Sequence, residues 1–154
     1  MKSPMSRVKI FEQKIAGMCG PAALRALLSY FDKQCSEAYL KRLCHSSKLY
    51  VTKPQALIGC LRQMGFVVHF EVWGDKEDTW NKLDHWLNVM KLPVLVDWFS
   101  KFDGHYSVAI KLTKEYIWLA DPEYRRKKDR ILKLRWDDFF RAWFDFHGDY
   151  LTKK

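Results

Sequence analysis

Apolar residues recur at helical spacing through the N-terminal part of the chain. Pro21 stands where a first-turn proline belongs, at the head of a run rich in helix formers. The apolar stripe of that run consists of Leu24, Leu27, Leu28 and Phe31. Ser36 precedes a second, shorter helix over 37–44, and a third over 54–64 ends at Gly65. The N-terminal half is therefore predicted to be helical.

After Gly65 the pattern changes to alternation, with many β-branched and aromatic residues, which is typical of strands. We expect strands over 66–73, 93–98, 104–110, 116–122 and 130–134. Two helices are expected among them, over 80–90 with Thr79 as its cap and over 136–144. Residues 2–8 and 153–154 are expected to be frayed ends. Helices first and an antiparallel sheet second predict an α+β fold, with the helical half packed on the sheet.

Residues 104–122 have the pattern of two strands joined by a short polar turn. If the turn is centred on Thr113, paired residue numbers sum to 226, and His105 lies directly opposite Asp121. Opposed residues of antiparallel strands point to the same face, so this register predicts a contact between the two side chains. Asp103, two residues before His105, is a rival partner, but it lacks this cross-strand geometry.

Composition indicates one domain over residues 1–154, with a core of about 9–145. The chain is 48% hydrophobic and 16% aromatic, which excludes a disordered protein. No apolar run is long enough to span a bilayer, and the N-terminus lacks the apolar core of a signal peptide. A soluble, cytoplasmic protein is expected, and export as an effector stays open.

The formal net charge of +9 favours anionic partners in general terms. The densest basic cluster is 125–130, for which a solvated loop is the expected role. No nucleic-acid-binding motif accompanies the cluster, so nucleic acid is not expected as a partner.

Four cysteines lie at positions 19, 35, 44 and 60, a density far below that of disulfide-stapled secreted domains. Cys35, Cys44 and Cys60 have apolar neighbours in helix-like segments, so we expect reduced cysteines in the core. A zinc site made by these three residues with His45 is the alternative, but no Cys-x-x-Cys pair supports it.

Cys19 is a candidate nucleophile because it lies at the expected start of the first helix. Backbone amides and the positive end of the helix dipole favour a thiolate there. His105 could form an ion pair with that thiolate and later protonate a leaving amine, while Asp121 holds the imidazole in one tautomer. The Cys19 amide and the side-chain amide of Gln13 are natural donors to an oxyanion. A cleft is expected where the helical half meets the sheet.

Three short motifs occur in a fixed order along the chain: Gln13-x5-Cys19-Gly20-Pro21-Ala22-Ala23-Leu24, Gly104-His105-Tyr106-Ser107-Val108-Ala109 and Ala120-Asp121-Pro122. In this order they resemble the bacteriocin-processing peptidases, papain-like cysteine peptidases that remove double-glycine leader peptides. The resemblance covers about 9–145 and implies a papain-like cysteine peptidase fold that cuts a peptide or protein substrate without metal or organic cofactor. By matching position it implies Cys19 as nucleophile, His105 as general base and acid, Asp121 as orienting residue and Gln13 as oxyanion donor.

Two features depart from the family pattern. Met18 stands before the nucleophile, where family members often carry an acidic residue. Many members are fused to an ABC transporter, whereas this sequence contains neither membrane helices nor a nucleotide-binding element. A secretion or transport system, or a target protein, is therefore an expected partner. Trp98 and Gly104 are candidate substrate-binding residues, although Trp98 is equally suited to cap the core.

The candidate site residues are compatible with three functions. Hydrolysis through an acyl-thioenzyme, with a Gly-Gly leader site as the expected cleavage point, is favoured by the matching order of Gln13, Cys19, His105 and Asp121. The same site could transfer the acyl group to an amine, as an isopeptidase or transpeptidase does. A non-catalytic papain-like binding or regulatory module would suit the net charge of +9 and the cluster 125–130.

Overall fold

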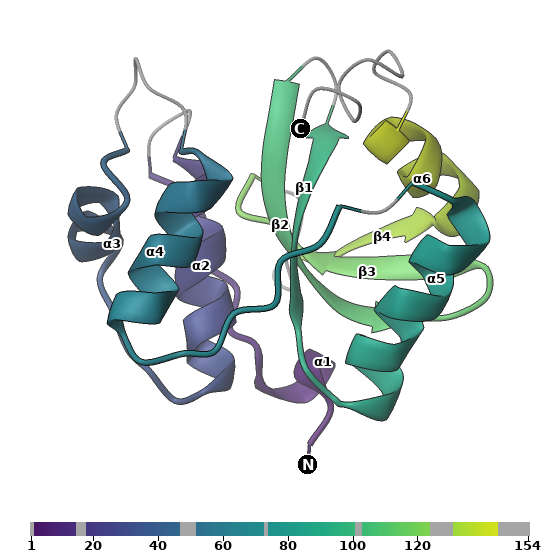
Figure 1. Ribbon diagram of the computed structural model, residues 1–154, viewed down its shortest axis with the longest axis horizontal. Coiled ribbons are helices and arrows are strands. Elements are labelled where there is room, and N and C mark those ends of the chain that lie inside the picture. Colours follow the sequence, from purple (N-terminus) through teal and green to yellow (C-terminus); the bar gives the residue numbers. More distant parts are fainter. Residues whose placement is uncertain are drawn as a thin grey trace.

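The computed structural model places helices first and a sheet second (Figure 1). It describes residues 2–14, 18–46, 52–72, 74–100, 103–123 and 131–144. The helical elements are α1 (Pro4–Arg7), α2 (Cys19–Tyr30), α3 (Glu37–Leu43), α4 (Pro54–Gln63), α5 (Lys76–Asp84), its π-helical continuation η1 (His85–Val89) and α6 (Trp136–Phe144). The strands are β1 (Val94–Ser100), β2 (Asp103–Leu112), β3 (Tyr116–Ala120) and β4 (Ile131–Arg135). The basic cluster 125–130 lies outside the described residues.

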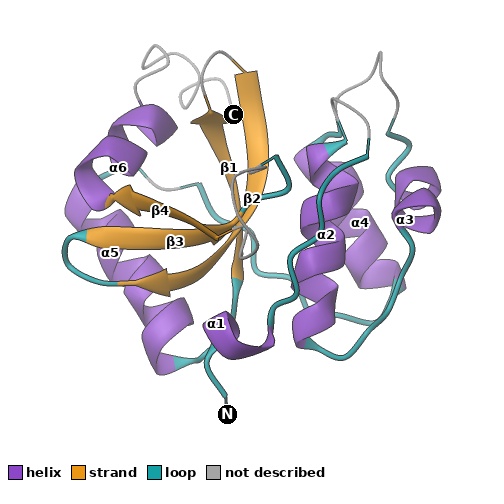
Figure 2. Ribbon diagram, turned by 180° about the vertical axis from the view of Figure 1, so that it is seen from behind, coloured by secondary structure: helices purple, strands orange, loops and turns teal. Residues whose placement is uncertain are grey.

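The sheet is antiparallel in the order β1-β2-β3-β4, and a hydrophobic core lies on each of its faces. Helices α2, α3 and α4 gather on one side and α5 and α6 on the other (Figures 1 and 2). Tyr106 and Val108 of β2 pack with α2 and α4, whereas Ala109 packs with residues of α5 and α6. The α+β prediction, with a helical half against an antiparallel sheet, is confirmed.

Helix α2, the first helix that the sequence predicts, begins where expected. Its N-terminus packs tightly against Thr52 of the segment before α4. Most of α2 is buried, including Cys19 and the stripe residues Leu24, Leu27 and Leu28, whereas Phe31, just after the helix, is exposed. A Cβ atom added to Gly20 would lie 2.7 Å from both Cβ and Oγ1 of Thr52. Only glycine lets the helix backbone come this close to the Thr52 side chain. The Tyr106 hydroxyl donates to the Thr52 carbonyl at 3.0 Å, which ties this contact to the sheet.

The predicted second and third helices are confirmed with their boundary residues. The Ser36 hydroxyl caps α3 by accepting a hydrogen bond from the Tyr39 N–H at 3.1 Å. Gly65, with φ of 88°, follows α4 in the left-handed region that glycine adopts without strain.

The predicted hairpin exists, but its register differs from the prediction. Thr113 and Tyr116 close the turn through a 2.8 Å hydrogen bond from the Thr113 N–H to the Tyr116 carbonyl, so its centre lies between residues 114 and 115. Paired residues include Val108 with Ala120, and a bulge between Ala109 and Lys111 shifts the register along β2. The predicted register was wrong because the turn is centred between residues 114 and 115 and not on Thr113, and the bulge then changes the pairing by one residue more.

Three further boundaries differ from prediction. Residues 66–72 are extended but form no strand, and Val67 is 88% exposed there, because no neighbouring strand pairs with this segment. Asp75, not Thr79, caps α5 by accepting from two backbone N–H groups at 2.9 Å each, which leaves Thr79 buried inside the helix. Residues 2–8 are not frayed, because they contain α1 with a buried Pro4.

Candidate active site

Cys19 is the first residue of α2, with Met18 at the N-cap position. Its side chain is buried, with 6% of the residue exposed. At this position the sulfur lies beside the unpaired amides of the first helical turn. The local sequence therefore places a thiol at the N-terminus of a buried helix.

The structure brings His105 and Asp121 together, as the sequence predicts. Nε2 of His105 lies 3.0 Å from Oδ1 of Asp121, and both residues are 3% exposed. The contact is diagonal, because Asp121 follows the end of β3 and the β2–β3 register carries it toward Ser107. His105 and Ser107 lie two apart on β2 and so share one face, which lets both reach the same carboxylate.

Ser107 and Trp98 extend this contact into a buried hydrogen-bond chain. The Trp98 indole N–H donates to the Ser107 hydroxyl at 3.0 Å, and that hydroxyl donates to Oδ2 of Asp121 at 3.0 Å. The Trp98 ring also packs edge-on against His105, with centroids 5.9 Å apart. Sequence reasoning did not assign Ser107 a role, although its spacing of two residues from His105 in a strand was the available signal.

Gln13 is held by the turn that follows β3. Its backbone N–H donates to the Pro122 carbonyl at 3.0 Å, and its side-chain Nε2 donates to Oε1 of Glu123 at 3.4 Å. The Glu123 backbone N–H donates in turn to Oδ1 of Asp121 at 2.7 Å. One short segment therefore contacts Gln13 and carries the partner of His105. Sequence reasoning missed Glu123, for which no motif gives a signal.

The surroundings of His105 raise its pKa to about 10, from an ordinary value of 6.5. Burial alone lowers the pKa, but hydrogen bonds to Asp121 and Cys19 and the charges of both groups outweigh it. The ring is therefore an imidazolium at neutral pH. Because Nε2 contacts Asp121, the contact with Cys19 falls to Nδ1. A sulfur beside an imidazolium that a carboxylate orients is equipped for nucleophilic attack with proton transfer.

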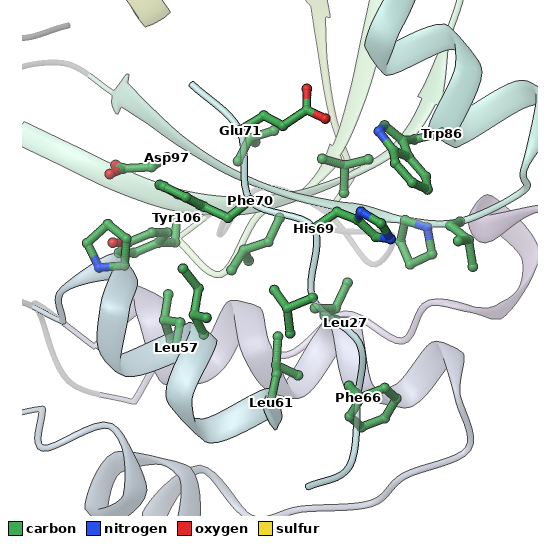
Figure 3. Close-up of a pocket in the computed structure, with 18 of the residues that line it drawn as sticks. Leu27, Leu57, Leu61, Phe66, His69, Phe70, Glu71, Trp86, Asp97 and Tyr106 are labelled. Carbon is green, nitrogen blue, oxygen red and sulfur yellow. The ribbon is translucent and has the colours of Figure 1, made fainter. Parts of the chain in front are cut away.

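A mostly apolar pocket of about 300 Å³ lies between the helices and the sheet (Figure 3), and Gln13, Cys19, His105 and Asp121 are not among the residues that line it. Leu27, Leu57 and Leu61 line it from α2 and α4, and the extended segment 66–72 crosses it. Tyr106 lines it from β2, facing the helices.

The two candidate substrate-binding residues have different positions. Trp98 lines the pocket and also packs on Phe139 in the core, with ring centroids 5.4 Å apart. Its position is therefore compatible both with capping the core and with lining a binding site. Gly104 pairs with Phe99 at the start of the β1–β2 ladder and is not among the described residues that line the pocket. Its assignment stays a prediction.

The four cysteines are free thiols, and Cys44 and Cys60 lie in the core. Within the described part of the chain, no three His, Cys, Asp or Glu side chains gather in a group that could hold a metal ion. A search of the same residues finds no helix with the length and apolar character needed to cross a membrane.

Comparison with known proteins gives a consistent result. The model of the Peptidase C39 family matches residues 7–146. The peptidase domain of Streptococcus ComA, a bi-functional ABC transporter of a quorum-sensing pathway, superposes with a TM-score of 0.72 at 20% identity, over 88% of this chain and 92% of that chain. A double-glycine-motif protease from an AMS/PCAT transporter, solved with its leader peptide, gives 0.69 at 18% identity, over 89% and 86% of the two chains. No curated protein sequence matches the chain. The fold is that of the papain-like C39 peptidase domains, and the chain belongs to the Peptidase C39 family.

Proposed function

We propose that this protein is a cysteine peptidase that hydrolyses a peptide bond through an acyl-thioenzyme on Cys19. The observation that carries the proposal is the buried His105 ring, which contacts Asp121 through Nε2 at 3.0 Å and also contacts Cys19. Membership of the Peptidase C39 family supports a peptidase hydrolase. The same four residues that the sequence singles out would carry the reaction.

In the proposed reaction the Cys19 thiolate attacks the carbonyl carbon of the substrate. The resulting oxyanion accepts hydrogen bonds from the Cys19 backbone N–H and the Gln13 side-chain amide. The His105 imidazolium donates its Nδ1 proton to the leaving amine as the C–N bond breaks. The neutral ring then takes a proton from water, whose oxygen attacks the thioester and releases the acid, the thiolate and the imidazolium. Asp121 holds the ring through Nε2 in each step.

We infer that the substrates are peptides with a double-glycine leader, supplied by a secretion or transport system. Two findings support this class. One solved neighbour is a double-glycine-motif protease in complex with a leader peptide. The apolar pocket beside Trp98 and Tyr106 suits the apolar side chains of a peptide segment that precedes the cleaved bond (Figure 3).

The test uses the purified protein and a synthetic peptide in which Gly-Gly separates a leader from a short cargo. We expect one cut after the second glycine, with the mass of one water added across the two products. Cys19→Ala should lower the rate by about 10³-fold or more, while its circular dichroism spectrum stays that of the wild type. The control variant is His85→Gln, which alters an exposed histidine that does not line this pocket and should leave the rate unchanged. A peptide with Ala-Ala in place of Gly-Gly tests the substrate class.

Two results would change the assignment. A leader product joined to an added amine, in place of the free acid, would assign amine transfer to the same site. Peptide binding that survives Cys19→Ala, falls steeply with salt and never yields product would replace the peptidase by a binding module.

A further inference from the structure

Glu123 contacts two parts of the proposed site at once. Its Oε1 accepts the 3.4 Å hydrogen bond from Nε2 of Gln13, and its Oε2 lies 4.0 Å from Nδ1 of His105. Its backbone N–H is fixed on Asp121 by the 2.7 Å hydrogen bond. The carboxylate therefore lies between the oxyanion donor and the nitrogen of the imidazole that meets Cys19.

The contact with Gln13 leaves that side chain able to serve the reaction. A side-chain amide has two N–H groups, so one can bind Glu123 while the other points at an oxyanion. The adjacent Pro122 carbonyl holds the Gln13 backbone at 3.0 Å, so two consecutive residues hold the main chain and the side chain of Gln13. Fixing the rotamers of a donor before the reaction is what makes an oxyanion site effective.

The contact with His105 is electrostatic. Ionisable groups that face the ring are Cys19 from α2, Asp121 beyond β3 and Glu123, and the uncharged Trp98 ring packs on it from β1. The Glu123 side chain is 46% exposed, so water partly screens its charge. A carboxylate at this distance still favours the charged form of the imidazole.

We propose that Glu123 is a positioning residue of this site, which aims the Gln13 amide at the oxyanion and holds the His105 ring in its charged form on the Cys19 side. The inference rests on the proposed function, because the roles of Gln13 and His105 are assigned there.

The test separates the hydrogen bond from the charge. Glu123→Gln keeps a carbonyl oxygen that can accept from Gln13 but removes the charge, and Glu123→Ala removes both. We expect kcat for the Gly-Gly peptide to fall by about tenfold in Glu123→Ala with little change in KM, and to fall less in Glu123→Gln. In both variants the His105 pKa, followed by NMR of the ring, should fall by about half a pH unit at low salt. The matched control is Glu77→Ala on α5, an exposed carboxylate that should move neither quantity.

Two outcomes would overturn the proposal: an unchanged kcat in Glu123→Ala, or an unchanged His105 pKa in Glu123→Gln. The NMR titration needs no substrate, so it judges the role of Glu123 even if no peptide is cut. Absence of cleavage by the wild type would count against the proposed function instead. If Glu123→Ala lost its cooperative thermal transition, Glu123→Gln, which conserves size and polarity, would decide alone.

Discussion

Asp121 is the residue on which the site is organised. Its carboxylate accepts from the Ser107 hydroxyl and the Glu123 N–H and contacts the His105 ring. A buried carboxylate needs such partners, because desolvation without them costs several kcal/mol. With both oxygens engaged, Asp121 has one orientation, and this orientation sets the plane of the imidazole. The short segment that carries Asp121 and Glu123 thus determines how the His105 ring faces Cys19.

The raised pKa of His105 predicts how stability depends on pH. Folding favours the protonated ring, so its contribution to the free energy of unfolding is complete below the ordinary value of 6.5 and is lost as pH rises to about 10. Urea denaturation of wild type and His105→Gln should therefore differ more at pH 6 than at pH 10. A gap for His105→Gln that widened toward pH 10 would contradict the assigned charge.

Ser107→Ala should weaken both stability and catalysis. The substitution leaves the Trp98 indole N–H without its acceptor and Asp121 without one donor, in a region where Ser107 is fully buried. We expect a loss of about 1–3 kcal/mol in the free energy of unfolding and a lower kcat. Denaturant unfolding and peptide cleavage measure these. Ser6→Ala, at an exposed serine of α1, should lower the free energy of unfolding only slightly. Equal losses in the two variants would show that the Trp98–Ser107–Asp121 hydrogen bonds do not stabilise the fold.

At the scale of helices and strands, the position of the α2 N-terminus determines where the Cys19 sulfur lies. Close approach to Thr52 sets that position, and Tyr106 links Thr52 to β2, the strand that carries His105. The contact at Gly20 therefore helps to align the helical half with the sheet. The extended segment 66–72 lines the pocket from outside the sheet, with Phe66 and Val68 packed against the core and Val67 exposed.

Gly20→Ala should displace the start of α2. The added Cβ would lie 2.7 Å from Thr52 atoms, so we expect a cost of about 1–3 kcal/mol from overpacking, together with slower alkylation of Cys19. Gly59→Ala in α4 is the matched control. Nothing lies within 4 Å of the Cβ it would add, and it should be neutral or slightly stabilising because alanine favours helix. Thermal melts compare them, and a larger loss at Gly59 would refute the packing argument.

At the scale of the whole molecule, the two faces of the sheet bury different cores, and Cys19, Cys44 and Cys60 all belong to the core that contains α2 and α4. Cys44 and Cys60 lie deep in the core between the helices and the sheet, and burial together with the neighbouring Cys60 raises the pKa of Cys44 to about 12. Burial also raises the pKa of Cys60. Cys19 belongs to the same core but lies at its edge with His105.

Iodoacetamide labelling at pH 7.5 should therefore discriminate among the cysteines. We expect Cys19 to react within minutes, whereas Cys44 and Cys60 should react only once urea unfolds the chain, because they are buried and protonated. Half-buried Cys35 serves as an internal reference for accessibility without activation. Peptide mass mapping gives each rate. Equal rates at Cys19 and Cys35 would mean that Cys19 is not activated.

Local signals account for the parts of the fold that the sequence predicts well. Pro21, the Ser36 cap and Gly65 act on the backbone within a few residues, and each boundary they predict is present. The strand expected over 66–73 fails because a strand requires a partner, which alternation alone does not supply. Thr79 is not the cap because the helix begins one turn earlier, where the Asp75 carboxylate accepts from the backbone N–H groups of Glu77 and Asp78.

The sequence by itself determines the helical half, the hairpin, and the chemistry available in Gln13, Cys19, His105 and Asp121. It also carries the family resemblance that the matched family model confirms. Only the tertiary structure decides the diagonal His105–Asp121 contact, the Trp98–Ser107–Asp121 chain and the place of Glu123 between Gln13 and His105. The reason is that secondary structure follows from neighbours along the chain, whereas a bulge, a register and a side-chain contact depend on residues far apart in sequence.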